Sequence, residues 1–156
     1  MEIKAPNVVP RGKFKIFLAG SIEMGKAEMW QDEVVKQLGS YDVILLNPRR
    51  DDWDNSWVQD VNNPQFYEQV SWEIANLRDA DIVLFYFAPG TQSPITLLEF
   101  GMLMGLSNTP TVVCCPDGFW RKGNVDVVCK MAKIPVFDSW QDGVDYIKVA
   151  LEEIFK

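Results

Sequence analysis

The chain contains no histidine among its 156 residues. This absence excludes Ser-His-Asp and Cys-His catalysis, phosphoryl transfer through histidine and most zinc sites. If the protein is an enzyme, its chemistry must come from carboxylates, lysine, tyrosine or backbone groups.

Cysteine and positive charge are also scarce. The three cysteines, Cys114, Cys115 and Cys129, are odd in number and clustered. They do not suggest a disulfide framework, so we expect a reducing, cytoplasmic location. The 15 basic residues are outnumbered by 22 acidic ones, and the net charge is −7. We therefore expect no binding to a nucleic acid polymer or an anionic membrane, although a small anionic ligand needs only a local site.

Several sequence features that mark membrane and cofactor-binding proteins are missing. No apolar run is long enough to span a bilayer, and the polar segment 1–10 does not resemble a signal peptide. Neither a GxGxxG pattern nor a Walker loop is present, and we expect no cofactor and no metal. The composition is that of a globular protein, and the length predicts one domain, residues 1–156.

Apolar runs alternate with helical patterns along the chain. The predicted strands cover 14–19, 43–46, 82–87, 111–115 and 135–137, and the predicted helices cover 26–38, 64–78, 95–106, 125–132 and 142–155. Continuous apolar strands separated by helices are typical of a parallel sheet covered on both faces. We predict an α/β fold with a doubly wound, five-stranded parallel sheet in the flavodoxin-like order 2-1-3-4-5.

Ligands on such sheets bind at the carboxyl ends of the strands. Gly20 and Ser21 follow the first predicted strand directly. A small residue lets backbone N–H groups face a ligand and the serine adds a hydroxyl, which suits an anion or a sugar. The alternative for these two residues is a plain tight turn.

Glu99 is the only ionisable residue in the apolar run 95–106. Because this run is apolar on all sides, we expect a buried helix rather than a surface one. Burial raises the pKa of a carboxyl group and leaves its ionised form poorly solvated, which suits acid/base or nucleophilic chemistry. The alternative is a structural carboxylate at an exposed helix start, capped or paired with an arginine.

Glu73 lies on the predicted helix 64–78, at the edge of its core-facing stripe. If this helix and the Glu99 helix both meet the carboxyl edge of the sheet, the two carboxylates share a pocket. Two carboxylates that flank one sugar are the arrangement used in glycosyl transfer. A solvated glutamate on a helix surface is the alternative.

Two tryptophans, Trp53 and Trp57, lie in the polar loop that follows Arg49. Loops rarely carry two tryptophans without burying them. A nucleobase stacked between them is one interpretation, since a base gains about 1–3 kcal/mol on an aromatic side chain. A lid that packs on the protein's own core is the other.

Four segments of the chain resemble the nucleoside 2-deoxyribosyltransferase family, within its deoxyribosyltransferase-like subgroup. They are Ile16-Phe17-Leu18-Ala19-Gly20-Ser21-Ile22, Ala80-Asp81-Ile82-Val83-Leu84, Leu98-Glu99-Phe100-Gly101 and residues 118–124. Their order and spacing match over nearly the whole chain. The resemblance implies a doubly wound fold and exchange of nucleobases on 2′-deoxynucleosides.

The resemblance also implies roles for particular residues. Glu99 is the expected nucleophile, which forms a covalent deoxyribosyl intermediate, and Glu73 replaces an aspartate that moves protons to and from the base. Ser93 and Ser21 match serines that contact the 5′-phosphate in related nucleoside-monophosphate N-glycosidases. Asn124 matches an asparagine that reaches the 5′ pocket of a neighbouring subunit, which implies a homo-oligomer built on dimers. Base recognition is then expected from Arg49, Trp53 and Trp57.

Two residues depart from the family pattern. Phe17 replaces a tyrosine that orients the nucleophile, and Ile95 replaces a glycine common in phosphate-binding members. Three functions remain open at this point: a deoxyribosyltransferase, an N-glycoside hydrolase of deoxynucleosides or their monophosphates that uses the same Glu99, and a nucleotide-binding module without turnover. The expected ligands are a small deoxynucleoside and a nucleobase.

Overall fold

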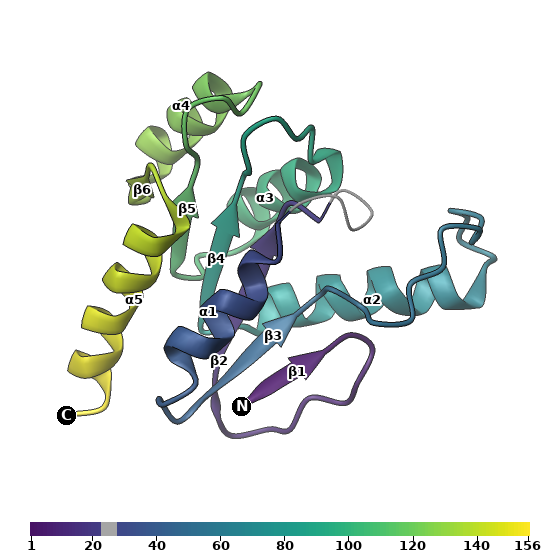
Figure 1. Ribbon diagram of the computed structural model, residues 1–156, viewed down its shortest axis with the longest axis horizontal. Helices are drawn as coiled ribbons and strands as arrows, with labels where there is room; N and C mark the ends of the chain where they lie inside the picture. The colour runs from purple at the N-terminus through teal and green to yellow at the C-terminus, as the bar shows by residue number, and fades with distance from the viewer. Residues whose placement is uncertain (23–27) are drawn as a thin grey trace.

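The computed structural model describes residues 1–22 and 28–156, and the strands in this part of the chain form one parallel sheet (Figure 1). The order of its six strands is β1-β3-β2-β4-β5-β6. The strands are β1 (Glu2–Lys4), β2 (Phe14–Gly20), β3 (Val43–Asn47), β4 (Ile82–Tyr86), β5 (Thr111–Cys114) and β6 (Val136–Phe137). The helices are α1 (Trp30–Leu38), α2 (Pro64–Asp79), α3 (Pro94–Leu106), α4 (Lys122–Ala132) and α5 (Trp140–Ile154).

The predicted number of strands is wrong, because β1 adds a sixth strand at the edge beside β3. Its register pairs Glu2 with Leu45 and Lys4 with Asn47. The sequence gives no apolar run here, since two of the three residues are charged, and backbone pairing with an existing edge decides the structure. The five predicted strands lie in the order β3-β2-β4-β5-β6 within the larger sheet.

Several helix boundaries differ from the predicted ones. The predicted start of the first helix at 26–27 lies outside the described residues, and Glu28 and Met29 precede α1 without being helical. The last helix begins at Trp140 rather than at 142, because the Ser139 side chain accepts a hydrogen bond from the backbone N–H of Asp142 at 3.1 Å.

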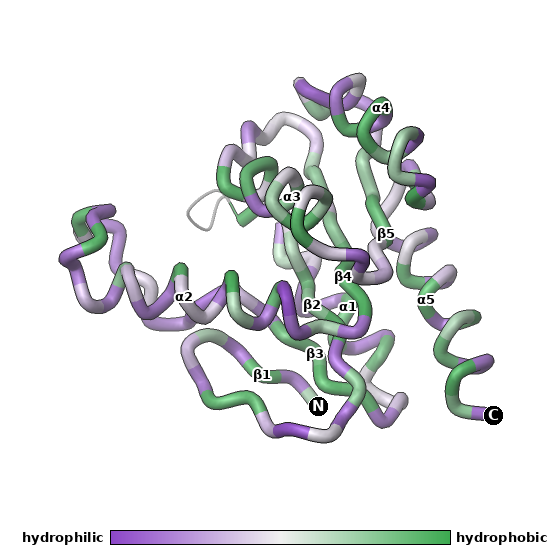
Figure 2. The backbone as a smooth tube through the Cα atoms, turned by 180° about the vertical axis from the view of Figure 1, so that it is seen from behind, coloured by the Kyte–Doolittle hydropathy of each residue, from purple (hydrophilic) through white to green (hydrophobic). Residues whose placement is uncertain are grey.

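The two faces of the sheet carry separate hydrophobic cores. Helices α1 and α5 cover one face, where Trp30, Leu84 and Val144 belong to one buried cluster. Helices α2, α3 and α4 cover the other face, where Leu77 and Phe100 belong to a second cluster (Figures 1 and 2). The candidate catalytic carboxylates therefore lie on the second face.

The prediction that the Glu99 helix is buried on all sides is wrong for its outer face. Phe100 and Leu103 are buried against the sheet, but Leu98 is 67% exposed and Leu106 is 70% exposed. Helix α3 is hydrophobic along most of its length (Figure 2), and within the described chain its outer side has no complete cover. Among the described residues, no helix has the length and apolar character needed to cross a membrane.

Candidate active site

Two carboxylates from neighbouring helices come together on the second face of the sheet. Glu73 lies on α2 and Glu99 on α3, and these two helices contact each other. The negative charge of Glu73 acts on Glu99. Both side chains are partly accessible to solvent. The structure thus brings together the two residues that the sequence predicts as catalytic.

Both carboxyl groups have raised pKa values. Burial, and to a smaller extent the charge of Glu73, raises the pKa of Glu99 from 4.5 to about 8. Burial raises the pKa of Glu73 from 4.5 to about 7, against a hydrogen bond from Gln69 that lowers it. A carboxyl group that titrates near neutral pH is suited to move protons under physiological conditions.

The alternative role of Glu99 is a structural one, in which its carboxylate caps a helix or pairs with an arginine. Within the part of the chain that the structure describes, no side chain donates a hydrogen bond to this carboxylate and no cation pairs with it, and the pKa of Glu99 responds only to burial and to Glu73. Phe17, which stands where the family has an orienting tyrosine, is fully buried and packs near Trp72 with ring centroids 6.1 Å apart. Phe17 therefore offers Glu99 no hydrogen-bond donor.

A cluster of hydroxyl groups lies at the N-terminal end of α3. The Ser21 Oγ lies 2.5 Å from the Ser93 Oγ and 3.0 Å from the Thr91 Oγ1, and it accepts a hydrogen bond from the backbone N–H of Ala88 at 2.9 Å. Ser21 and Ser93, predicted to bind the substrate, thus meet across 72 residues of sequence. Thr91 completes the cluster and was missed because the sequence pattern did not mark it.

Ser93 holds an unusual backbone conformation at the start of α3. Its φ of 45° is in the left-handed region, which non-glycine residues rarely adopt. Pro94 then provides the first helical residue, which favours the abrupt start of the helix. The first turn of α3, with its partial positive charge, follows the hydroxyl cluster directly and suits an anionic or oxygen-rich group.

Gly20, the other residue predicted at this edge, is required by packing. A Cβ atom at this position would lie 2.5 Å from the backbone oxygen of Tyr86 and 2.7 Å from the ring of Trp30. The indole of Trp30 also donates a hydrogen bond to the backbone oxygen of Ser21 at 3.2 Å. Gly20 therefore lets Trp30 pack on the end of β2 and fix Ser21 in place.

Arg49 lies at the carboxyl end of β3, but its side chain is directed toward the start of α1. The guanidinium group donates to the backbone oxygen of Glu28 at 3.0 Å and contacts the Met29 sulfur at 2.9 Å. Burial lowers its pKa, and Arg49 is 7% exposed. No contact joins it to either carboxylate among the described residues, so its role in base recognition stays a prediction.

Trp53 and Trp57 pack against each other, with ring centroids 5.2 Å apart in an edge-to-face arrangement. The guanidinium of Arg50 lies 5.0 Å from the Trp57 ring centroid, and Arg50 also binds Asp52 and Glu68. No hydrogen bond or ring contact joins these indoles to the carboxylates within the described segments. Their stacking on a base stays a prediction.

Asn124 is exposed on α4 and makes no side-chain contact to the two carboxylates in the described chain. It lies on the same helix face as the exposed residues Val127, Val128 and Met131, which follow it at three, four and seven positions. The structure therefore places Asn124 on an apolar outer surface.

Gln69 is a site residue that the sequence analysis missed. Its side-chain amide donates to Glu73 Oε1 at 2.8 Å and to the backbone oxygen of Pro48 at 2.9 Å. The sequence signal that could have found Gln69 was its spacing from Glu73, because residues four positions apart on a helix share one face.

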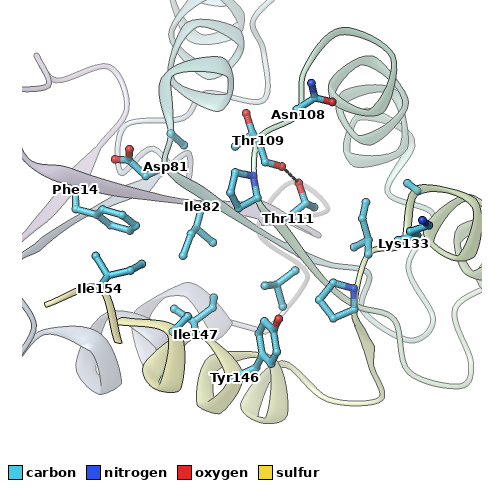
Figure 3. A pocket seen from close by; sticks show the side chains of 17 residues that line it. Phe14, Asp81, Ile82, Asn108, Thr109, Thr111, Lys133, Tyr146, Ile147 and Ile154 are labelled. Atoms are coloured by element: carbon cyan, nitrogen blue, oxygen red, sulfur yellow. Dashed lines mark hydrogen bonds between the residues drawn. The ribbon is translucent and has the colours of Figure 1, made fainter. Parts of the chain in front are cut away.

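A hollow near the other end of the sheet lies apart from the candidate site (Figure 3). It lies between α5 and the amino ends of β4 and β5, and contributors include Ile82, Thr111, Lys133 and Tyr146. Its lining contains no paired carboxylates and none of the predicted site residues.

The family model described as "nucleoside 2-deoxyribosyltransferase like" matches residues 13–119. This segment runs from β2 to the loop before α4 and contains Ser21, Glu73, Ser93 and Glu99. The chain belongs to the nucleoside 2-deoxyribosyltransferase-like family. The sequence resemblance is thereby confirmed at the level of the family.

A solved structure shares the fold of this nucleoside 2-deoxyribosyltransferase-like chain. It is the crystal structure of a conserved protein from Enterococcus faecalis V583, with a TM-score of 0.64 and 17% sequence identity. The match covers 89% of this chain and 99% of that one. At this identity the likeness shows the fold alone. No curated protein matches the chain significantly.

Proposed function

We propose that the protein is a nucleoside 2-deoxyribosyltransferase, a glycosyltransferase-type enzyme that exchanges nucleobases on 2′-deoxyribonucleosides. The observation that carries this proposal is the pair Glu73 and Glu99, on two helices that contact each other and close enough for the charge of Glu73 to act on Glu99, with pKa values of about 7 and about 8. Paired carboxylates of this kind serve glycosyl transfer, with one as nucleophile and the other as acid and base.

The first half of the reaction forms a covalent intermediate. A Glu99 carboxylate oxygen attacks the anomeric carbon as the glycosidic C–N bond breaks, and the electron pair of that bond goes to the leaving base. Glu73 gives its proton to the base nitrogen. The missing 2′-hydroxyl withdraws less electron density, so the cation-like transition state is easier to reach than in a ribonucleoside.

The second half reverses these steps with another base. Glu73 takes a proton from the incoming base, whose nitrogen attacks the anomeric carbon and displaces Glu99. Two displacements retain the configuration of the sugar. Transfer exceeds hydrolysis only while a base occupies the site and excludes water.

Protonation of the pair fits this cycle. At a pH between the two pKa values the pair holds about one proton, which the higher pKa of Glu99 places mostly on Glu99 in the free protein. The reaction requires this proton on Glu73. Developing positive charge at the anomeric carbon favours ionised Glu99, and the basic nitrogen of the leaving group draws the shared proton from Glu73. Substrate binding thus selects the reactive distribution of that proton.

A chromatographic assay tests the proposal. Wild-type protein is incubated with deoxyinosine, with and without adenine, beside Glu99→Ala and the control Glu153→Gln, which changes an exposed glutamate on α5. We expect deoxyadenosine only with adenine, in wild type and the control, and its loss in Glu99→Ala. Failure of a panel of deoxynucleosides and monophosphates to react would overturn the proposal and favour a nucleotide-binding module, whose affinity Glu99→Gln would leave nearly unchanged.

The hydroxyl cluster supports a second candidate, an N-glycoside hydrolase of deoxynucleoside 5′-monophosphates. Ser21, Thr91 and Ser93 lie at the N-terminal end of α3, where a phosphate is well accommodated. The hydrolase predicts release of free base without an acceptor, and faster release from a monophosphate than from its nucleoside. A dependence of product on added base argues against it.

We also propose that the enzyme works as a homo-oligomer built on dimers. Apolar side chains are exposed on the outer faces of α3 and α4, and Asn124 lies among those of α4. Covering them with a second copy would bring Asn124 to that copy, as the family pattern implies. Light scattering should give a dimer or larger for wild type and for the control Val149→Lys on α5, and a monomer for Met131→Lys. A monomeric wild type would contradict this proposal.

A cytoplasmic location is part of the same proposal. Cys114, Cys115 and Cys129 are all free and buried, which is in keeping with a reducing compartment.

A further inference from the structure

The side chain of Gln69 bridges the candidate acid/base carboxylate and the carboxyl end of a strand. Its Nε2 donates one hydrogen to Glu73 Oε1 at 2.8 Å and the other to the backbone oxygen of Pro48 at 2.9 Å. Pro48 follows β3 directly. Gln69 is 3% exposed, so these bonds are shielded from competing water.

The surroundings fix the orientation of this amide. Both partners of Nε2 are acceptors, and the Gln69 Oε1 is buried without a hydrogen-bond partner in the described structure. Rotating the amide by half a turn would place Oε1 against two oxygen atoms and remove both bonds. Gln69 can therefore donate to Glu73 but cannot accept from it.

We propose that Gln69 is a positioning residue that holds the Glu73 carboxylate against the end of β3 and selectively stabilises its ionised form. This inference rests on the proposed function of Glu73 as acid and base. A donor-only contact favours the charged carboxylate over the neutral acid. It also restricts the rotation of the Glu73 side chain, which otherwise has three free torsions.

Other charged groups near Glu73 act differently. Glu99, on α3, is negative when ionised and disfavours a second charge beside it. Arg49, next to Pro48, binds Glu28 and Met29 instead of Glu73. The contact from Gln69 is the one side-chain hydrogen bond that lowers the pKa of Glu73 among the described residues, and it works against the effect of burial.

This preference has a consequence for the proposed reaction. When the glycosidic bond breaks, the O–H bond of Glu73 breaks as well and its proton moves to the base nitrogen, which leaves Glu73 ionised. Gln69 stabilises that product state more than the protonated starting state. Without it, Glu73 is a weaker acid and the base leaves more slowly.

The test compares two glutamine substitutions on one helix. Gln69→Met keeps the length of the side chain and removes both donors, whereas Gln65→Met makes the same change at an exposed position one turn earlier. Carboxyl ¹³C signals of labelled glutamate are titrated by NMR, and the Glu73 signal is assigned by its loss in Glu73→Gln. We expect the Glu73 midpoint to be about one pH unit higher in Gln69→Met and unchanged in Gln65→Met.

Kinetics provide a readout that a purely structural role would not move. The kcat/KM profile has a limb set by the titration of Glu73, the group of the pair with the lower pKa, and this limb should move to higher pH in Gln69→Met, with about a tenfold lower kcat at the optimum. Conformational damage alone lowers the rate at every pH without moving the limb. An unchanged limb together with an unchanged NMR midpoint would overturn the inference.

The NMR titration needs no turnover, so it separates this inference from the proposed function. A raised midpoint in a protein without transferase activity leaves Gln69 as a positioning residue for Glu73 and removes only the reaction. If Gln69→Met does not fold, the side-chain amide ¹H–¹⁵N signals of Gln69 are followed in wild type instead. They should titrate with the Glu73 midpoint, and pH-independent signals would overturn the inference.

Discussion

The two faces of the sheet have the same architecture but bury different kinds of ionisable side chain. The face under α1 and α5 has a closed apolar core that contains the Cys114 thiol, with a pKa that burial raises to about 12. That thiol stays neutral at physiological pH. The face under α2, α3 and α4 contains Glu73 and Glu99, whose pKa values are raised toward neutrality because their ionised forms are buried. Burial of these charges opposes folding.

The outer surfaces differ in the same sense. Helix α5 begins with a serine cap and turns a buried stripe toward the sheet. Helix α3 follows Ser93, which has a left-handed φ of 45° and caps no backbone N–H with its side chain among the described residues, and large apolar side chains are exposed on the outer side of the helix. One face therefore stabilises the fold, and the other gives up stability for chemistry and for association.

Among the changes that test this comparison, Glu99→Gln in alkaline solution is expected to have the largest effect on the free energy of unfolding. The folded-state pKa of about 8 lies above 4.5, so between these values the folded protein keeps a proton that the unfolded chain has lost. Wild-type stability is therefore lost as the pH rises through this range, whereas the glutamine of the variant does not titrate and causes no such loss. We expect the variant to be more stable by about 3 kcal/mol at pH 9 and little changed at pH 5.

Urea denaturation at the two pH values measures this difference, with Glu153→Gln as the control for an exposed glutamate. Parallel pH dependence in Glu99→Gln and wild type would mean that Glu99 is solvated in the native state.

Gly143→Ala tests how tightly the closed face is packed. A Cβ atom there would lie 2.3 Å from the Cys114 sulfur and 3.4 Å from a Leu84 methyl carbon. Overpacking of this kind outweighs the higher helix propensity of alanine, and we expect a loss of about 2 kcal/mol in the free energy of unfolding. Thermal or urea unfolding measures the loss, and wild-type stability would show that α5 can move away from β5.

Glu73→Gln separates the two causes of the raised Glu99 pKa. Burial is the larger cause and the charge of Glu73 the smaller. Removal of that charge should lower the Glu99 midpoint by about one pH unit and still leave it above 4.5. Carboxyl ¹³C titration gives the midpoint, and Glu68→Gln, which changes an exposed glutamate on the same helix, should not alter it.

Sequence reasoning recovered the parts of this molecule that depend on local pattern. The central strands are continuous apolar runs, and Pro64 begins both the predicted helix and α2, so alternation of elements follows from the sequence. The edge strand β1 was missed because backbone pairing, rather than side-chain pattern, creates it. The outer side of α3 was misjudged because apolar composition does not tell a buried helix from one that is exposed in the single chain.

For the candidate site, the carboxylate pair was predictable and the side chains that hold it were not. Glu99 stood out as a charge in an apolar run, and Glu73 was predicted to share its pocket. Arg49 follows β3 as expected, but its side chain turns to Glu28 and Met29. Side-chain direction depends on tertiary packing, which also explains why the Gln69 bridge to Pro48 was not foreseen.

The smallest effect is expected from Gly101→Ala on α3, the counterpart of Gly143→Ala. Among the described residues, no heavy atom outside the chain neighbours and backbone of α3 lies within 4 Å of a Cβ built at Gly101, so alanine costs no packing and gains helix propensity. We expect the free energy of unfolding to rise by about 0.5–1 kcal/mol at low protein concentration. If a second copy packs closely on α3, the same methyl group should weaken association at high concentration. Stabilisation that is independent of concentration would mean that this part of the open face stays free.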